Sequence, residues 1–235
     1  MESQFGLANL WSQGDIVTRG VAVLLLIMSL ASWMVIIVKA LNLRVAARQA
    51  RASEAFWRAP DFEAGMAALG TEADNPFQQL ASQGREAAAH VQRPAAERGT
   101  PGHKAHLHDA LDLSEWITRS LRNAVDDATA GLQSGLAILA SVGSTAPFVG
   151  LFGTVWGIYH ALLSIGAAGQ ASIDKVAGPV GEALIMTALG LAVAIPAVLG
   201  YNALVRGNKN VLGKLNRFAH DLHAYFVTGA RIVKG

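Results

Sequence analysis

Three stretches of the chain are apolar enough and long enough to cross a membrane as helices. Residues 20–38 and 128–173 contain no charged side chain, and between Lys175 and Arg206 the only charged side chain is Glu182. Each stretch reaches the roughly 20 residues that a helix needs to span a bilayer. The pattern therefore predicts an all-α membrane protein with three transmembrane helices.

The polar part between the first two stretches is also predicted to be helical. It is rich in Ala, Arg, Glu and Gln and is punctuated by prolines and glycines, which favours helices near 40–58, 61–69 and 76–91 and a turn over 94–102. Beyond the turn, apolar residues recur at spacings of three, four and their sums, the pattern of an amphipathic helix: Leu107, Leu111, Ile117, Leu121, Val125 and Leu132. Since no proline interrupts this pattern before Pro147, we expect one continuous helix from about 105 to 165.

Composition and charge agree with a membrane protein and assign it a topology. Hydrophobic residues make up 52% of the chain and charged residues 15%. The net charge is only +2, and the sequence has no basic stripe of the kind that nucleic-acid-binding proteins carry. Residues 39–130 hold 11 Lys or Arg, residues 166–177 hold one, and residues 206–235 hold six. The positive-inside rule then predicts an outer N-terminus, long cytoplasmic helical extensions and a cytoplasmic C-terminus.

These observations divide the chain into seven segments. The expected boundaries are an outer N-terminus over 1–19, transmembrane helix 1 over 20–38, a cytoplasmic helical region over 39–131, transmembrane helix 2 over 132–165, an outer loop over 166–177, transmembrane helix 3 over 178–205 and a cytoplasmic tail over 206–235.

Small residues in the second and third spans predict close helix packing. Each glycine costs about 1 kcal/mol relative to alanine in a helix, but in a membrane it lets two backbones approach each other. Prolines in the same spans remove amide donors and introduce bends that neighbouring helices must accommodate. The expected packing residues are Gly150, Gly153, Gly157, Gly190, Pro147, Pro179 and Pro196.

Glu182 is the candidate functional residue because a carboxylate in a bilayer costs at least about 2.5 to 3.5 kcal/mol. Its presence requires a wet cavity, a cation or a bound proton, and a carboxyl group near neutrality can load and release protons. Thr154 and Thr187 carry hydroxyls that could position water beside it. Alternatively, Glu182 follows Pro179 by three residues and only complements a helix dipole at the membrane surface. A helix beginning near Ile173 would favour the first interpretation.

No cofactor or metal site is expected. The absence of cysteine excludes disulfides, thiolate metal sites and cysteine nucleophiles. His103, His106 and His108 follow a Pro-Gly pair and are interpreted as a solvated loop, and the scattered His160, His220 and His223 receive no role. Ser144, Ser164 and His160 show no recognised catalytic spacing, so we do not expect an enzyme. Three spans without an inverted repeat also argue against a solute transporter.

Two strings in the second and third spans resemble a known family. The strings are STAPFVGLFGTVWGI at 144–158 and GPVGEALIMTALGLAVAIPAVLGYN at 178–202. Both closely resemble the paired signatures of the ExbB/TolQ/MotA family of inner-membrane motor proteins, in the family's order and separation. The layout of three spans with an outer N-terminus agrees with the family over the rest of the chain.

The resemblance implies a function and partners. Glu182 matches the family's membrane carboxylate, and Thr154 and Thr187 match polar residues that face a central pore. Members form a homo-oligomeric ring, expected to be a pentamer, around the single spans of a partner dimer, ExbD or TolR. That partner supplies an aspartate taken to carry the protons, which leaves Glu182 to tune the pathway. No cofactor is implied beyond protons as the coupling ion.

Two branches of the family and one further class stay open. The strings at 174–182 (DKVAGPVGE) and 219–222 (AHDL) are more similar to the ExbB branch. An ExbB-type chain would act in a Gram-negative inner membrane with ExbD and TonB to energise outer-membrane uptake of iron siderophores and vitamin B12. A TolQ-type chain would act with TolR and TolA on envelope integrity. A non-conducting membrane scaffold, in which Glu182 is only a cap, is the alternative class.

Overall fold

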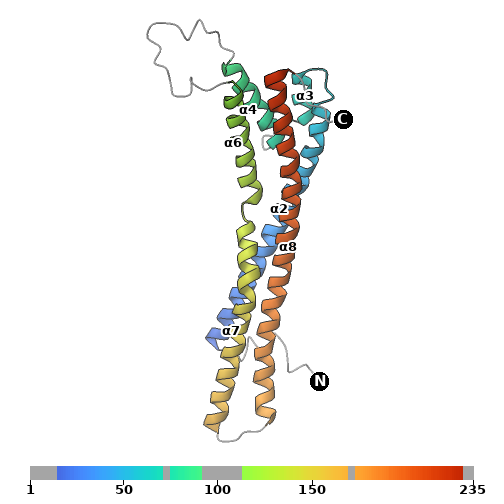
Figure 1. The fold of residues 1–235 in the computed structure, drawn as a ribbon. Helices are drawn as coiled ribbons and strands as arrows, with labels where there is room; N and C mark the ends of the chain where they lie inside the picture. Colours follow the sequence, from blue (N-terminus) through green and yellow to red (C-terminus); the bar gives the residue numbers. More distant parts are fainter. Residues whose placement is uncertain (1–14, 71–74, 92–112, 169–172, 230–235) are drawn as a thin grey trace, which may run out of the picture. The chain divides into compact units, whose positions relative to one another are not determined.

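The computed structural model describes residues 15–70, 75–91, 113–168 and 173–229, and within these ranges every regular element is a helix (Figure 1). The helices are α2 (Ile16–Phe56), α3 (Phe62–Leu69), α4 (Pro76–Val91), α6 (Leu113–Gln133), α7 (Leu136–Ala168) and α8 (Ile173–Thr228). The described residues form two compact units, one drawn from 1–40 and 135–205 and the other from 41–134 and 206–235. We call them the apolar unit and the polar unit.

The polar unit has its own hydrophobic core, to which α2, α3, α4, α6 and α8 all contribute. Phe77, Leu80, Ile117, Leu215 and Leu222 are completely buried in it. The predicted apolar stripe of the amphipathic helix is confirmed for the part the structure describes, because Ile117, Leu121 and Val125 all face this core. The residues expected to begin that stripe, Leu107 and Leu111, lie outside the described residues. The predicted helices at 61–69 and 76–91 are confirmed to within a residue at each end.

Aromatic side chains and two asparagines complete the polar unit. The Phe56 ring lies edge-on to Phe218, with ring centroids 5.2 Å apart. Asn75 is fully buried, where its side-chain amide donates to the Leu69 carbonyl at 2.7 Å and its Oδ1 accepts from the Phe77 amide at 3.0 Å. Asn208 on α8 donates to the Leu132 carbonyl at 2.8 Å, near the end of α6. These side chains satisfy backbone groups that helix ends leave unpaired.

The expectation of one continuous helix from 105 to 165 is wrong at Gly135. The chain turns there between α6 and α7, and Gly135 has a φ of 78°, a left-handed conformation that glycine adopts without a steric penalty. Propensity and apolar spacing carry no direct information on this backbone angle. The residues 105–112 of the expected helix are outside the described ranges.

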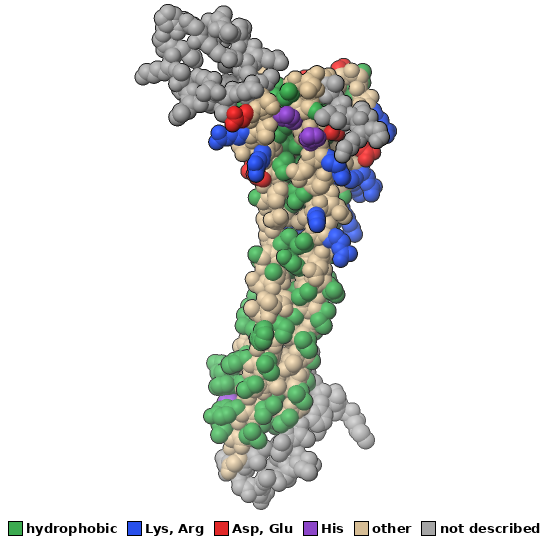
Figure 2. Space-filling model, viewed as in Figure 1, with side chains coloured by type: hydrophobic (Ala, Val, Ile, Leu, Met, Phe, Trp, Pro, Cys, Tyr) green, Lys and Arg blue, Asp and Glu red, His purple; other side chains and the backbone are tan. Residues whose placement is uncertain are grey.

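The apolar unit consists of α7 and the first parts of α2 and α8. Its small core contains Val21 and Leu25 from α2, Val142 from α7 and Met186 from α8. Most other large side chains point outward, including Leu30, Phe148 and Leu199 at 61%, 70% and 64% exposure. The face of this unit seen in Figure 2 carries hydrophobic side chains, whereas charged side chains gather on the polar unit. Such an exterior suits lipid or further protein chains.

Three helical stretches, Ile16–Phe56, Ser114–Leu163 and Gly178–Thr228, have the length and composition to cross a membrane, in agreement with the predicted three spans. The first and third spans continue without interruption into the polar unit, because α2 has 41 residues and α8 has 56. α7 extends to Ala168 and α8 begins at Ile173, so both ends of the segment expected as an outer loop over 166–177 are helical.

We predict that Asn75→Ala destabilises the polar unit by about 1 to 3 kcal/mol, because it leaves the buried Leu69 carbonyl and the start of α4 without their partner. The thermal unfolding midpoint of the purified chain in detergent measures this. Asn216→Ala is the matched control, since the exposed Asn216 only donates to Leu212 within its own helix. Equal midpoints for the two variants would contradict the prediction.

Candidate functional site

The second and third spans contact each other through glycine backbones. A Cβ atom on Gly150 would lie 2.6 Å from the Met186 carbonyl oxygen and 3.0 Å from the Gly190 Cα. A Cβ atom on Gly190 would likewise lie 2.6 Å from the Ala146 carbonyl oxygen. Only glycine fits at both positions, so the closest approach of α7 and α8 requires this pair.

Other predicted packing residues extend the same contact. Gly157 faces Ala183, where an added Cβ would lie 2.9 Å from the alanine methyl, and Gly153 faces both Met186 of α8 and Val21 of α2. Pro147 lies inside α7, and Pro179 and Pro196 lie inside α8, so none of these three prolines ends its helix. These distances place the glycines where α7 approaches α8 and α2, and their role in packing within a membrane stays a prediction.

Thr154 and Thr187 are brought together across this glycine contact. The Thr154 hydroxyl is buried, 3.0 Å from the Ala183 carbonyl oxygen and 2.5 Å from the Thr187 hydroxyl. The Thr154 hydroxyl can thus donate its proton to the Ala183 carbonyl while the Thr187 hydroxyl donates to the Thr154 oxygen. Within one chain the Thr154 hydroxyl is satisfied by α8, and Thr187 is the partly exposed member of the pair. Their pore-facing role stays a prediction.

Glu182 lies well inside α8, not in its first turn. The helix begins at Ile173, nine residues earlier, which corresponds to about 14 Å of helix. The alternative in which Glu182 caps a helix beginning at Pro179 is therefore wrong about where the helix begins. Glu182 is half-buried and directly precedes Ala183, whose carbonyl accepts from Thr154.

The helix contacts also place Glu182 along the apolar unit. Farther along α8, Gly200 contacts the Ile36 side chain, three residues before Lys39. From Glu182 to Gly200 is 18 residues, about 27 Å, which is close to the thickness of a hydrocarbon core. Glu182 thus lies toward the end of the apolar unit at which α2 begins. We call this end the Asp15 end.

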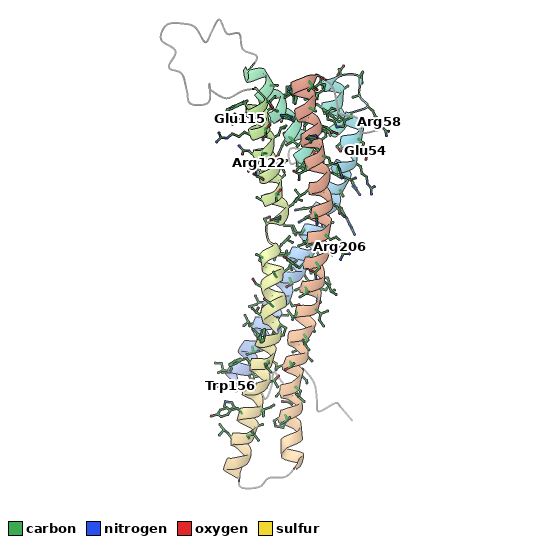
Figure 3. All side chains as sticks on the ribbon, in the orientation of Figure 1. Glu54, Arg58, Glu115, Arg122, Trp156 and Arg206 are labelled. Atoms are coloured by element: carbon green, nitrogen blue, oxygen red, sulfur yellow. The ribbon has the colours of Figure 1, made fainter. Side chains whose placement is uncertain are left out.

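A second polar group occupies the Asp15 end, which the sequence interpretation missed. The Trp156 Nε1 of α7 donates to Asp15 Oδ2 at 2.6 Å, and His160 Nε2 lies 3.8 Å from the same oxygen. The rings of Trp156 and His160 are in contact, with centroids 4.8 Å apart. The other carboxylate oxygen of Asp15 accepts from the Thr18 amide at 2.9 Å and so caps α2. We call Asp15, Trp156 and His160 the Asp15 cluster (Figure 3 labels Trp156).

The environment of Asp15 favours its ionised form. Desolvation alone would raise the pKa of Asp15, but hydrogen bonds from Thr18 and Trp156, together with the nearby His160, lower it below the ordinary value of 3.8. Ionised Asp15 therefore stabilises the fold fully at pH values above the ordinary pKa of 3.8. This contribution to stability is lost as the pH falls through the lowered pKa of the folded state. Between pH 5 and 8 Asp15 carries its charge.

The polar unit contains a groove of about 590 Å³ between α6 and α8, lined by Arg122, Asp126, Asn216, His220 and His223 among others. His223 is held by the Ser114 hydroxyl at 3.1 Å. In the part of the chain that the structure describes, no three His, Cys, Asp or Glu side chains are grouped to hold a metal ion. The histidines at 103, 106 and 108 lie outside that part.

Three membrane-length helices that pack through glycines, with a carboxylate in the third, define a helical multi-span membrane protein. The chain belongs to the MotA/TolQ/ExbB proton channel family, whose profile matches residues 77–217. It is 48% identical to the biopolymer transport protein ExbB of Xanthomonas campestris, over 98% of this chain and 92% of that protein. It is 41% identical to ExbB of Neisseria meningitidis, over 92% of this chain and 95% of that one. The Tol-Pal system protein TolQ of Pseudomonas aeruginosa is 33% identical, over 92% of this chain and 90% of TolQ.

We predict that Gly150→Ala weakens the packing of α7 on α8 by about 1 to 3 kcal/mol, because the new methyl group overlaps the Met186 carbonyl. The matched control is Gly181→Ala on α8, where an added Cβ meets nothing within 4 Å. Thermal unfolding midpoints and size-exclusion profiles of both variants in detergent provide the measurement. If Gly150→Ala matched the control in both, the close backbone contact would not be required.

Proposed function

We propose that this chain is the proton-channel or stator subunit of an inner-membrane motor of the ExbB type. In this proposal it uses the proton gradient, together with an ExbD-like single-span protein and a TonB-like transducer, to energise outer-membrane uptake of iron siderophores and vitamin B12. The observation that carries the proposal is the near-full-length similarity to ExbB proteins, at 48% and 41% identity. The similarity to TolQ proteins is lower, at 33% in Pseudomonas aeruginosa.

The arrangement around Glu182 supports a role in proton movement. Its carboxyl group belongs to a continuous helix and lies beside the residue whose carbonyl receives the Thr154 hydroxyl, so a titratable group and two hydroxyls share one stretch of α7 and α8. Thr187 and Glu182 are both partly exposed, and in the proposal they face a pore formed by several copies of the chain. In the proposal the copies form a ring, a pentamer by resemblance, around the partner's spans.

The energetics favour several protons for each stroke. One proton crossing a potential of 100 mV releases about 2.3 kcal/mol, whereas separating a contact of micromolar affinity requires about 8 kcal/mol. A ring with repeated sites can supply several such steps. The outward-facing side chains of α7 and α8, such as Phe148 and Leu199, provide apolar surface for contacts between copies and with lipid.

A TolQ-type subunit of the Tol-Pal system is the second candidate, supported by full-length similarity to TolQ. Identification of the small single-span protein that co-purifies with the chain separates the two. An ExbD-like partner supports the first proposal, and a TolR-like partner supports the second.

We predict that Glu182→Gln reduces partner-dependent, gradient-driven uptake by at least about tenfold while the ring still assembles. Glutamine keeps the shape and hydrogen bonding of the side chain but removes the titratable group. The measurement is siderophore uptake in cells, with membrane levels of each variant determined by immunoblot. Thr154→Val and Thr187→Val, which delete hydroxyls at nearly constant volume, should lower uptake in the same assay.

Asp221→Asn serves as the control, because it removes a carboxylate from the polar unit with the same change of chemistry. Full uptake by Glu182→Gln at normal abundance would exclude the proton-pathway role. A non-conducting scaffold predicts that result, since a helix-dipole contribution of about 0.3 to 1 kcal/mol would be all that is lost.

We predict that the basic residues of α2 and α8 face the cytoplasm. Lys39, Arg44, Arg206 and Arg217 would then lie near anionic headgroups, where each contributes about 1 kcal/mol. Because the chain has no cysteine, single cysteines report the topology directly. The reagent is a maleimide that crosses the outer membrane of intact cells but not the inner membrane. It should label Gln170→Cys and leave Arg217→Cys unlabelled. The reverse pattern would contradict the topology.

A further inference from the structure

The Asp15 cluster joins two membrane-length helices through a pair of titratable groups. Asp15 precedes α2, and Trp156 and His160 are one turn apart on α7. A single carboxylate oxygen receives the indole N–H and lies 3.8 Å from the imidazole. The imidazole is about half exposed and the carboxylate about one-third exposed, so protons can reach both. The glycine contacts between α7 and α8 do not involve these three residues.

We propose that the Asp15 cluster is a proton-binding clamp, which holds the start of α2 against α7 more firmly when His160 is protonated than when it is neutral. The protonated ring bears a positive charge beside the Asp15 carboxylate and beside the face of Trp156, and it is attracted to both. The neutral ring lacks this charge, and the Trp156 hydrogen bond then holds the helices without it.

Histidine ordinarily titrates between pH 5 and 8, whereas the lowered pKa of Asp15 keeps that carboxylate ionised in this window. The Tyr159 ring also lies edge-on to His160, with ring centroids 5.5 Å apart. A positive charge on His160 is therefore the change that the proposed clamp requires.

Charged groups from the neighbouring elements belong to the same environment. On α2, Arg19 is one turn after Asp15, and its backbone amide donates to the Asp15 carbonyl at 3.1 Å. On α8, Glu182 is next to Ala183, which contacts Gly157 of α7, so its carboxyl lies at the level of the cluster. Substitution of His160 and of Glu182 in turn decides which of the two residues is responsible for a pH dependence.

The clamp has a consequence if the proposed topology holds. The Asp15 end then faces the proton-rich compartment, and the occupancy of His160 reports the proton concentration on that side. Since α2 continues from the clamp into the polar unit as one helix, a change at its start acts on an element that both units share. This consequence rests on the proposed function, whereas the clamp itself does not.

Hydrogen exchange at the start of α2 tests the clamp in the full chain, purified in lipid nanodiscs and followed by mass spectrometry at pH 5.5 and pH 8. After correction for the intrinsic pH dependence of exchange, the wild-type segment 16–24 should exchange at least about threefold more slowly at pH 5.5. His160→Gln should remove this difference. His220→Gln, which alters an exposed histidine of the polar unit, should retain it.

Three further variants separate the contributions. Asp15→Asn keeps one oxygen that can cap α2, but it removes the charge and replaces Oδ2, the acceptor for Trp156, with an NH2 group, so it should also lose the pH difference. Trp156→Phe removes the indole donor and keeps a ring, so it should speed exchange at both pH values and retain a difference between them. Glu182→Gln should retain the difference.

Equal corrected exchange of the wild-type segment at the two pH values would overturn the clamp. So would a pH difference that survives in His160→Gln, or one that disappears in Glu182→Gln while His160→Gln keeps it. None of these results depends on uptake, so failure of the clamp is distinguishable from failure of the proposed function.

Discussion

The contact between the backbones of α7 and α8 at Gly150 and Gly190 is the constraint on which the rest of the apolar unit depends. In a hydrocarbon environment water does not drive helices together, so packing and hydrogen bonding must do so. The glycines let the two helices approach until the Thr154 hydroxyl reaches the Ala183 carbonyl on the other helix. Larger residues at this crossing would separate the hydroxyl from its acceptor and change the position of Glu182, one residue away.

The two units are stabilised in different ways although α2 and α8 pass through both. The polar unit buries large side chains such as Phe77 and Leu215 in a core of its own, as a water-soluble helical bundle does. The apolar unit buries few large side chains and presents most of them outward. The outward-facing side chains of the apolar unit suit contact with lipid or with further protein chains.

Titratable groups gather at one end of the apolar unit. Asp15 directly precedes α2, His160 belongs to α7 and Glu182 to α8, and the contacts of Trp156 with Asp15 and of Gly157 with Ala183 bring them to one level. A membrane protein that carries such groups within its apolar helices must hydrate them, pair them or bind protons with them. The Asp15 cluster meets this requirement by hydrogen bonding and charge pairing.

The sequence by itself predicted the three spans and most of the helices of the polar unit, and it singled out Glu182 and the glycines of the second and third spans. These features follow from composition, periodicity and the cost of a carboxylate in lipid, which depend on neighbours along the chain. It failed at Gly135, because a left-handed turn requires one backbone angle that apolar spacing does not encode. An aspartate before an apolar run is a recognised capping signal, so the cap at Asp15 could have been found. Its bond to Trp156, 141 positions away, could not, because only the packing of α2 on α7 brings the two together. The tertiary structure alone therefore decided that His160, which has no distinguishing neighbours in sequence, lies beside a carboxylate.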